Sequence, residues 1–283
     1  MQENSPHNST SLRLHKLFSL LKTPGKLLTR IKIKLFDADL KKKSFRDQYF
    51  SSKRALQTLA LLAVDQVPVL KVQSLEDCGF AARETDDDAI RLKDMFLEFG
   101  SDKSGIHNYH LLYAGLLRNH NAELSIFEMG LGTQHLEMIS NMGPEGKPGA
   151  SLRAFKEMYP HAFIYGADID KRILFDENRI KTFYASQLDM DSLIALQCQL
   201  SPVKFHLMID DGLHTPEANI NTLRFAIDLL APEGVFVIED IKESDIDFFL
   251  VTGGLLHSSF DFSIVKTQAA YVCVIKKKQS NRA

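Results

Sequence analysis

Acidic residues at the ends of two short apolar runs are the side chains of this sequence best suited to chemistry. Ile209-Asp-Asp-Gly-Leu-His214 closes one run, and Ile238-Glu-Asp240 closes the next. If the two runs are neighbouring strands, about 4.8 Å apart, their acidic ends converge. Clustered carboxylates repel one another unless a cation compensates them, and Mg²⁺ prefers oxygen ligands. The pattern predicts a divalent-metal site, and the alternative is that these acids cap helices or pair with lysines.

A histidine follows the first of these acidic pairs. His214 lies three residues after Asp211, on the loop beside the predicted metal site. Imidazole exchanges protons near neutral pH, so this position suits a general base that takes a proton from a metal-bound hydroxyl.

A glycine turn follows an earlier apolar run, Leu124–Met129. Gly130 and Gly132 permit a tight turn and the close approach of a ligand. The rest of the G-x-G-x-x-G dinucleotide fingerprint is missing. A ligand without a pyrophosphate does not need that fingerprint, and S-adenosylmethionine is such a ligand, whose amino group Glu128 suits. A purely structural turn is equally compatible with these glycines.

Two further strand ends carry polar residues. Asp168 follows an apolar run at the position that commonly hydrogen-bonds a ribose diol, while Asp170 could cap the next helix. Gln187 and Asp189 follow the next run and could contact an adenine amine. The alternative for these two residues is again a helix cap.

The elements that must position these residues alternate between strands and helices. Strands are predicted over 124–129, 162–168, 180–185, 205–210, 235–239, 260–265 and 270–275, and helices over 151–159, 189–200, 215–230 and 244–256. This alternation predicts an α/β fold with a Rossmann-like, doubly wound, mostly parallel sheet of seven strands. The last two strands must form an antiparallel hairpin, because their link is too short for a crossover.

Composition narrows the class of protein. The chain has 283 residues, 45% hydrophobic and 25% charged, with a net charge of −2, as in ordinary globular proteins. No nucleic-acid partner is expected from this charge. The three cysteines form no zinc or disulfide pattern, and no apolar stretch approaches the roughly 20 residues of a membrane span, so we expect a cytoplasmic location.

The N-terminal region differs from the rest in charge. Residues 1–54 hold 13 Lys/Arg against 4 Asp/Glu. Residues 1–11 are expected to be disordered, and residues 12–40 to form two amphipathic helical segments separated by Pro24-Gly25. They could lie on the inner, anionic membrane surface, or pack on the catalytic domain or on a second subunit of a homo-oligomer. We predict a basic, mainly helical extension over 1–95 and one domain over 96–283.

Several short motifs then occur in a characteristic order: Gly100-Ser-Asp-Lys103 with His107 and Tyr109, Glu128-Met-Gly130, Gly149-Ala-Ser-Leu-Arg153, Tyr165-Gly-Ala-Asp168 and the two acidic motifs. Over residues 96–245 their order and spacing resemble the Mg-dependent sugar O-methyltransferases of macrolide and aminocoumarin antibiotic biosynthesis. These are class I S-adenosylmethionine-dependent enzymes. Leu213 departs from the pattern, since such enzymes usually have Ser there.

The resemblance implies an S-adenosylmethionine- and Mg²⁺-dependent methyl transfer to a hydroxyl of a small-molecule or lipid-linked glycan. It assigns His214 as general base and Asp211, Glu239 and Asp240 as ligands of Mg²⁺ or another divalent ion. His107 and Tyr109 would cover substrate or cofactor. The implied cofactor contacts are Glu128, Gly130, Gly132, Asp168, Gln187, Asp189, Asp102 and Lys103.

Three alternatives stay open. A catechol-like acceptor would use the same metal chemistry. A non-catalytic, cofactor-binding scaffold at a membrane surface would not need the intact acidic cluster. A nucleotide-dependent oxidoreductase or epimerase would need the missing glycine fingerprint, and a Tyr-x-x-x-Lys pair occurs only at Tyr49 and Lys53, before the first predicted strand.

Overall fold

A computed structural model describes residues 24–118 and 123–278. The expected disorder of residues 1–11, and the amphipathic segment expected before Pro24, lie outside the described residues. By its internal contacts the chain divides into two compact units, Met1–Gln57 and Thr58–Ala283. The boundary near residue 95 therefore stays a prediction.

One long helix follows the expected break at Pro24-Gly25. Helix α2 spans Pro24–Gln66, 43 residues. Proline is tolerated in the first turn of a helix, because the N–H that it lacks has no intrahelical partner there. The break thus coincides with a helix start, and the helix expected after residue 44 is part of α2. Among the described residues no helix combines the length and apolarity that crossing a membrane requires.

The sheet confirms the predicted fold class and adds two short edge strands. Within the described residues it has nine strands in the order β1-β8-β9-β7-β6-β2-β3-β5-β4. Their bounds are β1 Val72–Ser74, β2 Ser125–Met129, β3 Phe163–Asp168, β4 Asp176–Glu177, β5 Ile180–Tyr184, β6 Phe205–Asp210, β7 Leu230–Ile241, β8 Phe260–Lys266 and β9 Tyr271–Lys277. Strands β8 and β9 form the predicted antiparallel hairpin.

Strand β7 is longer than predicted. It begins at Leu230 instead of at the predicted residue 235, so the turn-forming residues Pro232-Glu-Gly234 lie within its bounds. The pairing with β6 shifts register at this point, from Phe205 opposite Leu230 to Leu207 opposite Val235. The turn residues therefore leave the ladder as a bulge instead of preceding the strand.

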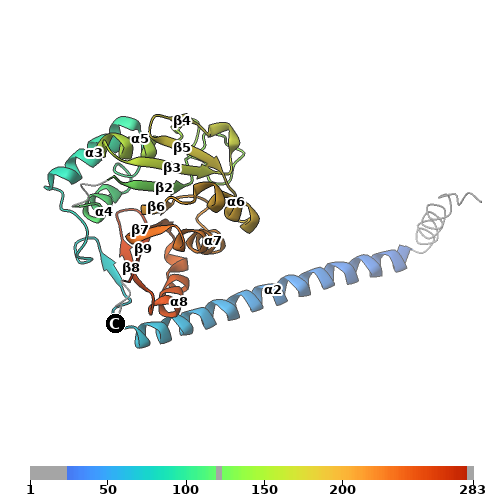
Figure 1. The fold of residues 1–283 in the computed structure, drawn as a ribbon. Coiled ribbons are helices and arrows are strands. Elements are labelled where there is room, and N and C mark those ends of the chain that lie inside the picture. The colour runs from blue at the N-terminus through green and yellow to red at the C-terminus, as the bar shows by residue number, and fades with distance from the viewer. Residues whose placement is uncertain (1–23, 119–122, 279–283) are drawn as a thin grey trace, which may run out of the picture. The chain divides into compact units, whose positions relative to one another are not determined.

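The chain reverses its direction across the sheet between β2 and β6. From β2 it runs outward to β3 and β5, and it then returns to β6 on the other side of β2 (Figure 1). Open α/β sheets bind ligands in the crevice beyond the carboxyl ends of the strands at such a switch point. The acidic strand ends identified from the sequence lie at this edge.

Helices cover both faces of the sheet, each with its own apolar core. Ile126 and Leu207 pack with α3, α4 and α5, whereas Phe127 and Met208 pack with α6, α7 and α8 (Figure 1). Successive strand residues thus point to opposite faces, and this alternation continues into the strand ends. The bounds are α3 Asp87–Phe99, α4 Tyr109–Leu116, α5 Ala150–Met158, α6 Met190–Leu200, α7 Pro216–Ile227 and α8 Ile246–Leu256, with single 3₁₀ turns η1 Lys171–Ile173 and η2 Glu243–Asp245.

Candidate active site

A pocket of about 700 Å³ opens at the carboxyl ends of β2, β3 and β6. Most residues predicted to act at the site line it: Asp102, Lys103, Glu128, Gly130, Gly132, Asp168, Gln187, Asp211, His214 and Asp240. Four predicted residues, His107, Tyr109, Asp189 and Glu239, are not among the lining residues.

The glycine turn after β2 is held against the chain that follows β6. Gly130 has a φ of 93°, and a Cβ at this position would lie 2.1 Å from the backbone oxygen of Asp211. A side chain is therefore excluded both by backbone conformation and by space. The turn brings the backbone of β2 into direct contact with the acidic strand end.

Asp168 ties this turn to the end of β3. Its carboxylate accepts hydrogen bonds from the backbone N–H groups of Leu131 and Asp170, each at 2.7 Å. Burial raises the pKa of Asp168, and these two donors oppose the rise. Asp168 lines the pocket, and its contact with a ribose stays a prediction.

Asp170 has the capping role that the sequence offered. Its side chain accepts from the backbone N–H of Arg172, at the start of η1. Thr133 Oγ1 at 2.6 Å, His135 Nδ1 at 2.8 Å and Arg172 Nε at 2.7 Å also contact it. Hydrogen bonds, first of all from Arg172, lower the pKa of Asp170. The carboxylate thereby anchors the base of the loop 133–148, which lines the pocket.

Gln187 and Asp189 are occupied by contacts within the protein. The Gln187 amide nitrogen donates to Asp210 and to Thr222, each at 2.7 Å, and its oxygen accepts from the Leu213 N–H at 2.8 Å. Asp189 caps α6, as the alternative interpretation proposed, so the geometry gives it no contact with the pocket.

The two adjacent acids at the end of β6 have different surroundings. Asp210 is fully buried on the α7 side and accepts from Asn219 Nδ2 at 3.0 Å and Gln187 Nε2 at 2.7 Å. Burial raises its pKa, against these amide donors. Asp211 points to the opposite side and into the pocket. Strand alternation therefore separates a structural carboxylate from one that is available for chemistry.

Lys103 lies at the centre of the acidic cluster. Its Nζ is 2.7 Å from Asp211 Oδ2 and 3.1 Å from Glu128 Oε1, and it also donates to Glu239 Oε2. Its side chain is only 2% exposed. Burial alone would lower the pKa of Lys103, but the three carboxylates raise it well above its usual range, so the amine is an ammonium ion.

Glu239 is held on both sides. Its two oxygens accept from Lys103 Nζ and from the hydroxyl of Tyr113. Burial and the neighbouring carboxylates raise the pKa of Glu239, against the opposing attraction of Lys103. Its role as a metal ligand stays a prediction. We did not identify Tyr113 from the sequence, although its position one helical turn after Tyr109 was a usable signal.

Tyr109 and His107 support Asp240. The Tyr109 hydroxyl donates to Asp240 Oδ1 at 2.5 Å, and the His107 ring stacks on Tyr109 with 4.6 Å between ring centroids. His107 Nδ1 lies 3.6 Å from the same carboxylate oxygen. Burial and the nearby acids raise the pKa of Tyr109, so its hydroxyl remains a donor. The geometry gives both residues contacts with Asp240, and their role as a cover stays a prediction.

The backbone at two of the site residues is unusual. Asp240 and His214 each have a φ of 53°. The pairing of β7 with β9 also shifts register between Ile238 and Ile241, so Asp240 leaves the regular alternation of the strand. Non-glycine residues in this conformation are uncommon and concentrate at functional sites.

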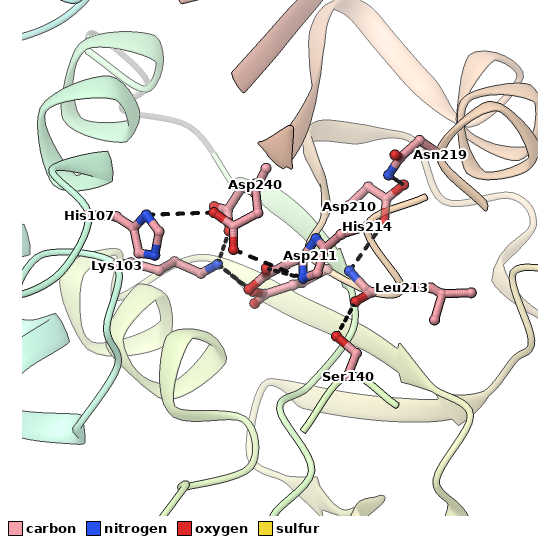
Figure 2. A network of polar contacts seen from close by, with 12 residues as sticks. Lys103, His107, Ser140, Asp210, Asp211, Leu213, His214, Asn219 and Asp240 are labelled. Carbon is pink, nitrogen blue, oxygen red and sulfur yellow. Dashed lines mark hydrogen bonds and ion pairs between the residues drawn. The ribbon is translucent and has the colours of Figure 1, made fainter. Parts of the chain in front are cut away.

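Three side chains form a group that could hold a cation. One ligand atom from each of Asp211, His214 and Asp240 lies within 4.8 Å of the others. His214 Nε2 is 3.8 Å from Asp211 Oδ1 and 4.0 Å from Asp240 Oδ2. Figure 2 shows Lys103 and His107 on one side of the two carboxylates and His214 on the other. Two carboxylates and an imidazole suit a divalent ion such as Mg²⁺ or Mn²⁺.

Comparison with known proteins finds O-methyltransferases among the sequence relatives. No protein-family model matches the chain. The chain is 29% identical over 158 residues to the 8-demethyl-8-alpha-L-rhamnosyl tetracenomycin-C 2'-O-methyltransferase of Streptomyces olivaceus, covering 56% of this chain and 39% of that protein. It is 33% identical over 122 residues to the demethylmacrocin O-methyltransferase of Streptomyces fradiae, covering 43% and 28%. The match thus spans well under half the length of these relatives.

A solved structure shares the fold. The methyltransferase MycE of the mycinamycin biosynthetic pathway, solved in complex with Mg and SAH, matches 68% of this chain and 56% of its own, with a TM-score of 0.54 and 22% identity. The chain therefore has the class I methyltransferase fold, and in sequence it is similar to sugar O-methyltransferases of macrolide and polyketide pathways.

Proposed function

We propose that this chain is an S-adenosylmethionine- and divalent-metal-dependent O-methyltransferase whose acceptor is a sugar hydroxyl of a glycosylated small molecule. One observation carries the proposal. Asp211, His214 and Asp240 form a cation-compatible group in the same pocket as the glycine turn and Asp168. The names of two relatives support the sugar acceptor, since both are named as O-methyltransferases, at the 2' and the 3' position, of a rhamnosyl tetracenomycin-C.

The cofactor half of the proposal rests on the β2 and β3 ends. Gly130 and Gly132 line that end of the pocket and add no side chain of their own, and Asp168 lines it with a carboxylate. S-adenosylmethionine fits these groups, since its ribose hydroxyls suit Asp168 and its amino group suits Glu128. When bound, it supplies the methyl group.

The metal half of the proposal rests on Asp211 and Asp240. Oδ1 of Asp211 and Oδ2 of Asp240 both face His214, and these hard oxygen donors suit Mg²⁺. When bound, the ion would orient the acceptor oxygens and lower the pKa of the reacting hydroxyl. Two residues are candidates for the third ligand. The family resemblance implies Glu239, whereas the geometry places His214 close to both carboxylates.

We propose that His214 is the general base, and the variants below test this role against that of a metal ligand. Its side chain lines the pocket and is only partly exposed, and its Nδ1 is buried without a hydrogen-bond partner among the described residues. In this role His214 would take the proton of the acceptor hydroxyl as the methyl group is transferred. The contacts with Asp211 and Asp240 keep the imidazole ring oriented toward the pocket.

The rim of the pocket supports an acceptor with an apolar part. Ile106, Ile139 and Leu188 line the pocket and are all exposed, Ile139 to 90%. A sugar attached to an apolar ring system would place its hydroxyls at the acidic centre and cover these side chains.

A binding experiment tests the cofactor and the metal together. S-adenosylhomocysteine should raise the melting temperature, NAD should not, and labelled methyl transfer to a glycoside acceptor should stop with a chelator and return with Mg²⁺. Stabilisation by NAD alone, or full turnover in the chelator, would contradict the proposal.

A pair of variants separates the two roles open to His214. If it is the base, His214→Ala keeps Mn²⁺ binding and S-adenosylhomocysteine binding but loses most turnover, by about 10²-fold to 10⁴-fold. If it is a ligand, Mn²⁺ binding falls as it does in Asp211→Asn. Undiminished turnover in His214→Ala would rule out both roles.

The basic N-terminal region supports a finer proposal about partners and location. Residues 1–54 carry excess positive charge, which would favour anionic lipid and bring the enzyme to a lipid-linked glycan from the cytoplasmic side. Co-sedimentation with anionic but not zwitterionic vesicles, lost on deletion of this region, tests it. If the full chain and the chain without residues 1–54 sediment equally with anionic vesicles, the membrane part of the proposal fails and a small-molecule acceptor remains. The enzyme could then be a monomer or a homo-oligomer.

A further inference from the structure

Lys103 is the buried charged group that the proposed chemistry does not use. Its ammonium lies among Glu128, Asp211 and Glu239, all within salt-bridge distance. Lys103, Glu128 and Glu239 are each at most 2% exposed. Burying ionised groups is costly unless they are paired, and the Lys103 ammonium is the cation that pairs with these carboxylates.

The contacts of the cluster divide it into two ends. The inner end consists of Glu128 and Glu239, whose carboxylates contact Lys103 and are almost fully buried, although Glu128 also lines the pocket. The outer end consists of Asp211, His214 and Asp240, which line the pocket.

Asp211 connects the two ends through its two oxygens. Its Oδ2 accepts from Lys103 at 2.7 Å, while its Oδ1 faces His214 at 3.8 Å. Asp240 is divided in a similar way, because Oδ1 accepts from Tyr109 and Oδ2 faces His214 at 4.0 Å. Each carboxylate is thus oriented by a donor, Lys103 for Asp211 (Figure 2) and Tyr109 for Asp240, and presents its other oxygen at the outer end.

We propose that Lys103 is a positioning residue, a built-in cation that fills the inner end of the acidic cluster and confines the exchangeable divalent ion to the outer end. The proposal rests on the metal site of the proposed function. Lys103 then acts through Asp211, since its ammonium fixes one oxygen of that carboxylate and so sets the direction of the other. It also keeps the inner carboxylates from drawing the ion away from the acceptor, so in this proposal Glu239 is not a ligand of the exchangeable ion.

Replacing the lysine by a small residue tests this role. Lys103→Ala removes the ammonium and leaves a space bounded by three carboxylates, which oxygen-seeking cations should enter. Equilibrium titration with Mn²⁺, followed by electron paramagnetic resonance, should show one more bound ion per chain than the wild type. Lys103→Met is the matched control, because its side chain fills the space without charge, and it should bind no additional ion.

Chemical rescue identifies where the additional ion lies. Propylammonium supplies the atoms that Lys103→Ala lacks, so it should displace the additional Mn²⁺ and leave the first ion bound. In the wild type and in Lys103→Met it should change nothing. A loss of the lysine's packing alone would show neither the additional ion nor its displacement by the amine.

The difference in bound Mn²⁺ between Lys103→Ala and the wild type tests this proposal independently of the proposed function. If the wild type binds no Mn²⁺, the metal part of the proposed function fails, while a gain of one ion in Lys103→Ala still supports the role of Lys103. An unchanged number of ions in Lys103→Ala overturns that role. If Lys103→Ala is unfolded in buffer, Mn²⁺ or propylammonium must restore its folded circular dichroism, and failure of both also overturns it.

Discussion

The carboxylates at the end of β3 and those at the ends of β6 and β7 are the same groups at the same edge of one sheet, yet their surroundings differ. Asp168 and Asp170 accept from backbone N–H groups, hydroxyls and Arg172 nearby in the sequence or the fold. Among the described residues, Asp211 accepts from Lys103 and Asp240 from Tyr109 through one oxygen, and each turns its second oxygen toward His214.

This difference shows what separates a structural acid from one available for chemistry. A carboxylate that receives several donors is already stabilised as an anion and gains little from a cation. Two carboxylates that each keep one oxygen directed toward the same histidine remain able to bind a cation. The position at a strand end is therefore necessary for the candidate metal site, and the number of donors decides which acids belong to it.

Removing an acid at the β7 end should have the largest effect. Asp240→Asn keeps the shape but loses one charge of the metal pair, so turnover should fall by about 10³-fold, because a bound metal contributes several kcal/mol to the transition state. Mn²⁺ binding should weaken in parallel, while S-adenosylhomocysteine still binds. Steady-state kinetics and metal titration measure these effects. An unchanged metal affinity would show that Asp240 is not a metal ligand and does not differ in this way from the acids at the end of β3.

The contact between the two regions can be broken at the glycine turn. Gly130→Ala should lower the free energy of unfolding by roughly 2–4 kcal/mol, because the new Cβ meets the Asp211 backbone oxygen and the backbone is strained. Gly143→Ala is the matched control, since it has a similar φ of 76° but no heavy atom within 4 Å. Denaturant titration should show a loss of only about 1 kcal/mol there, and equal losses would contradict the contact.

Removing the acid at the β3 end should weaken cofactor binding more than metal binding. Asp168→Asn should weaken S-adenosylhomocysteine binding by about 10-fold to 100-fold, the usual size for a hydrogen bond to a charged group. Isothermal titration with and without Mn²⁺ measures it. If Mn²⁺ affinity falls as much as cofactor affinity, the two regions do not have separate roles.

The smallest effect expected is a pH dependence at Asp170. Its pKa is lowered in the folded chain by hydrogen bonds from Arg172, with Thr133 and His135 assisting, so its stabilising contribution is fully present above the unfolded value of about 3.9 and is lost as the pH falls through the lower folded value. The stability difference between the wild type and Asp170→Asn should therefore be constant near pH 6 and shrink below about pH 4. Thermal melts across this range measure it, and a constant difference down to pH 2 would show that charge is not the cause.

Much of the fold could be predicted from the sequence, because strand and helix periods are local. The strands from β2 to β9 were recognised apart from the two-residue β4, and their carboxyl ends were expected to gather Asp211, Asp240 and His214, which line one pocket. The short strand β1 and the continuity of α2 through Gln66 were missed, since neither leaves a clear period in the sequence. The different fates of Asp210 and Asp211 were predictable in principle from strand alternation.

The sequence by itself thus determined that acids collect at one edge of a parallel sheet, since alternation and strand spacing are properties of the local chain. Only the tertiary structure decided which of these acids accept hydrogen bonds, and from which donors. Lys103 meets Asp211 and Glu239 across 108 and 136 residues, a contact that no local pattern encodes. Asp240 reaches the pocket because β7 shifts register against β9, and a register is set by the partner strand and not by the residue itself.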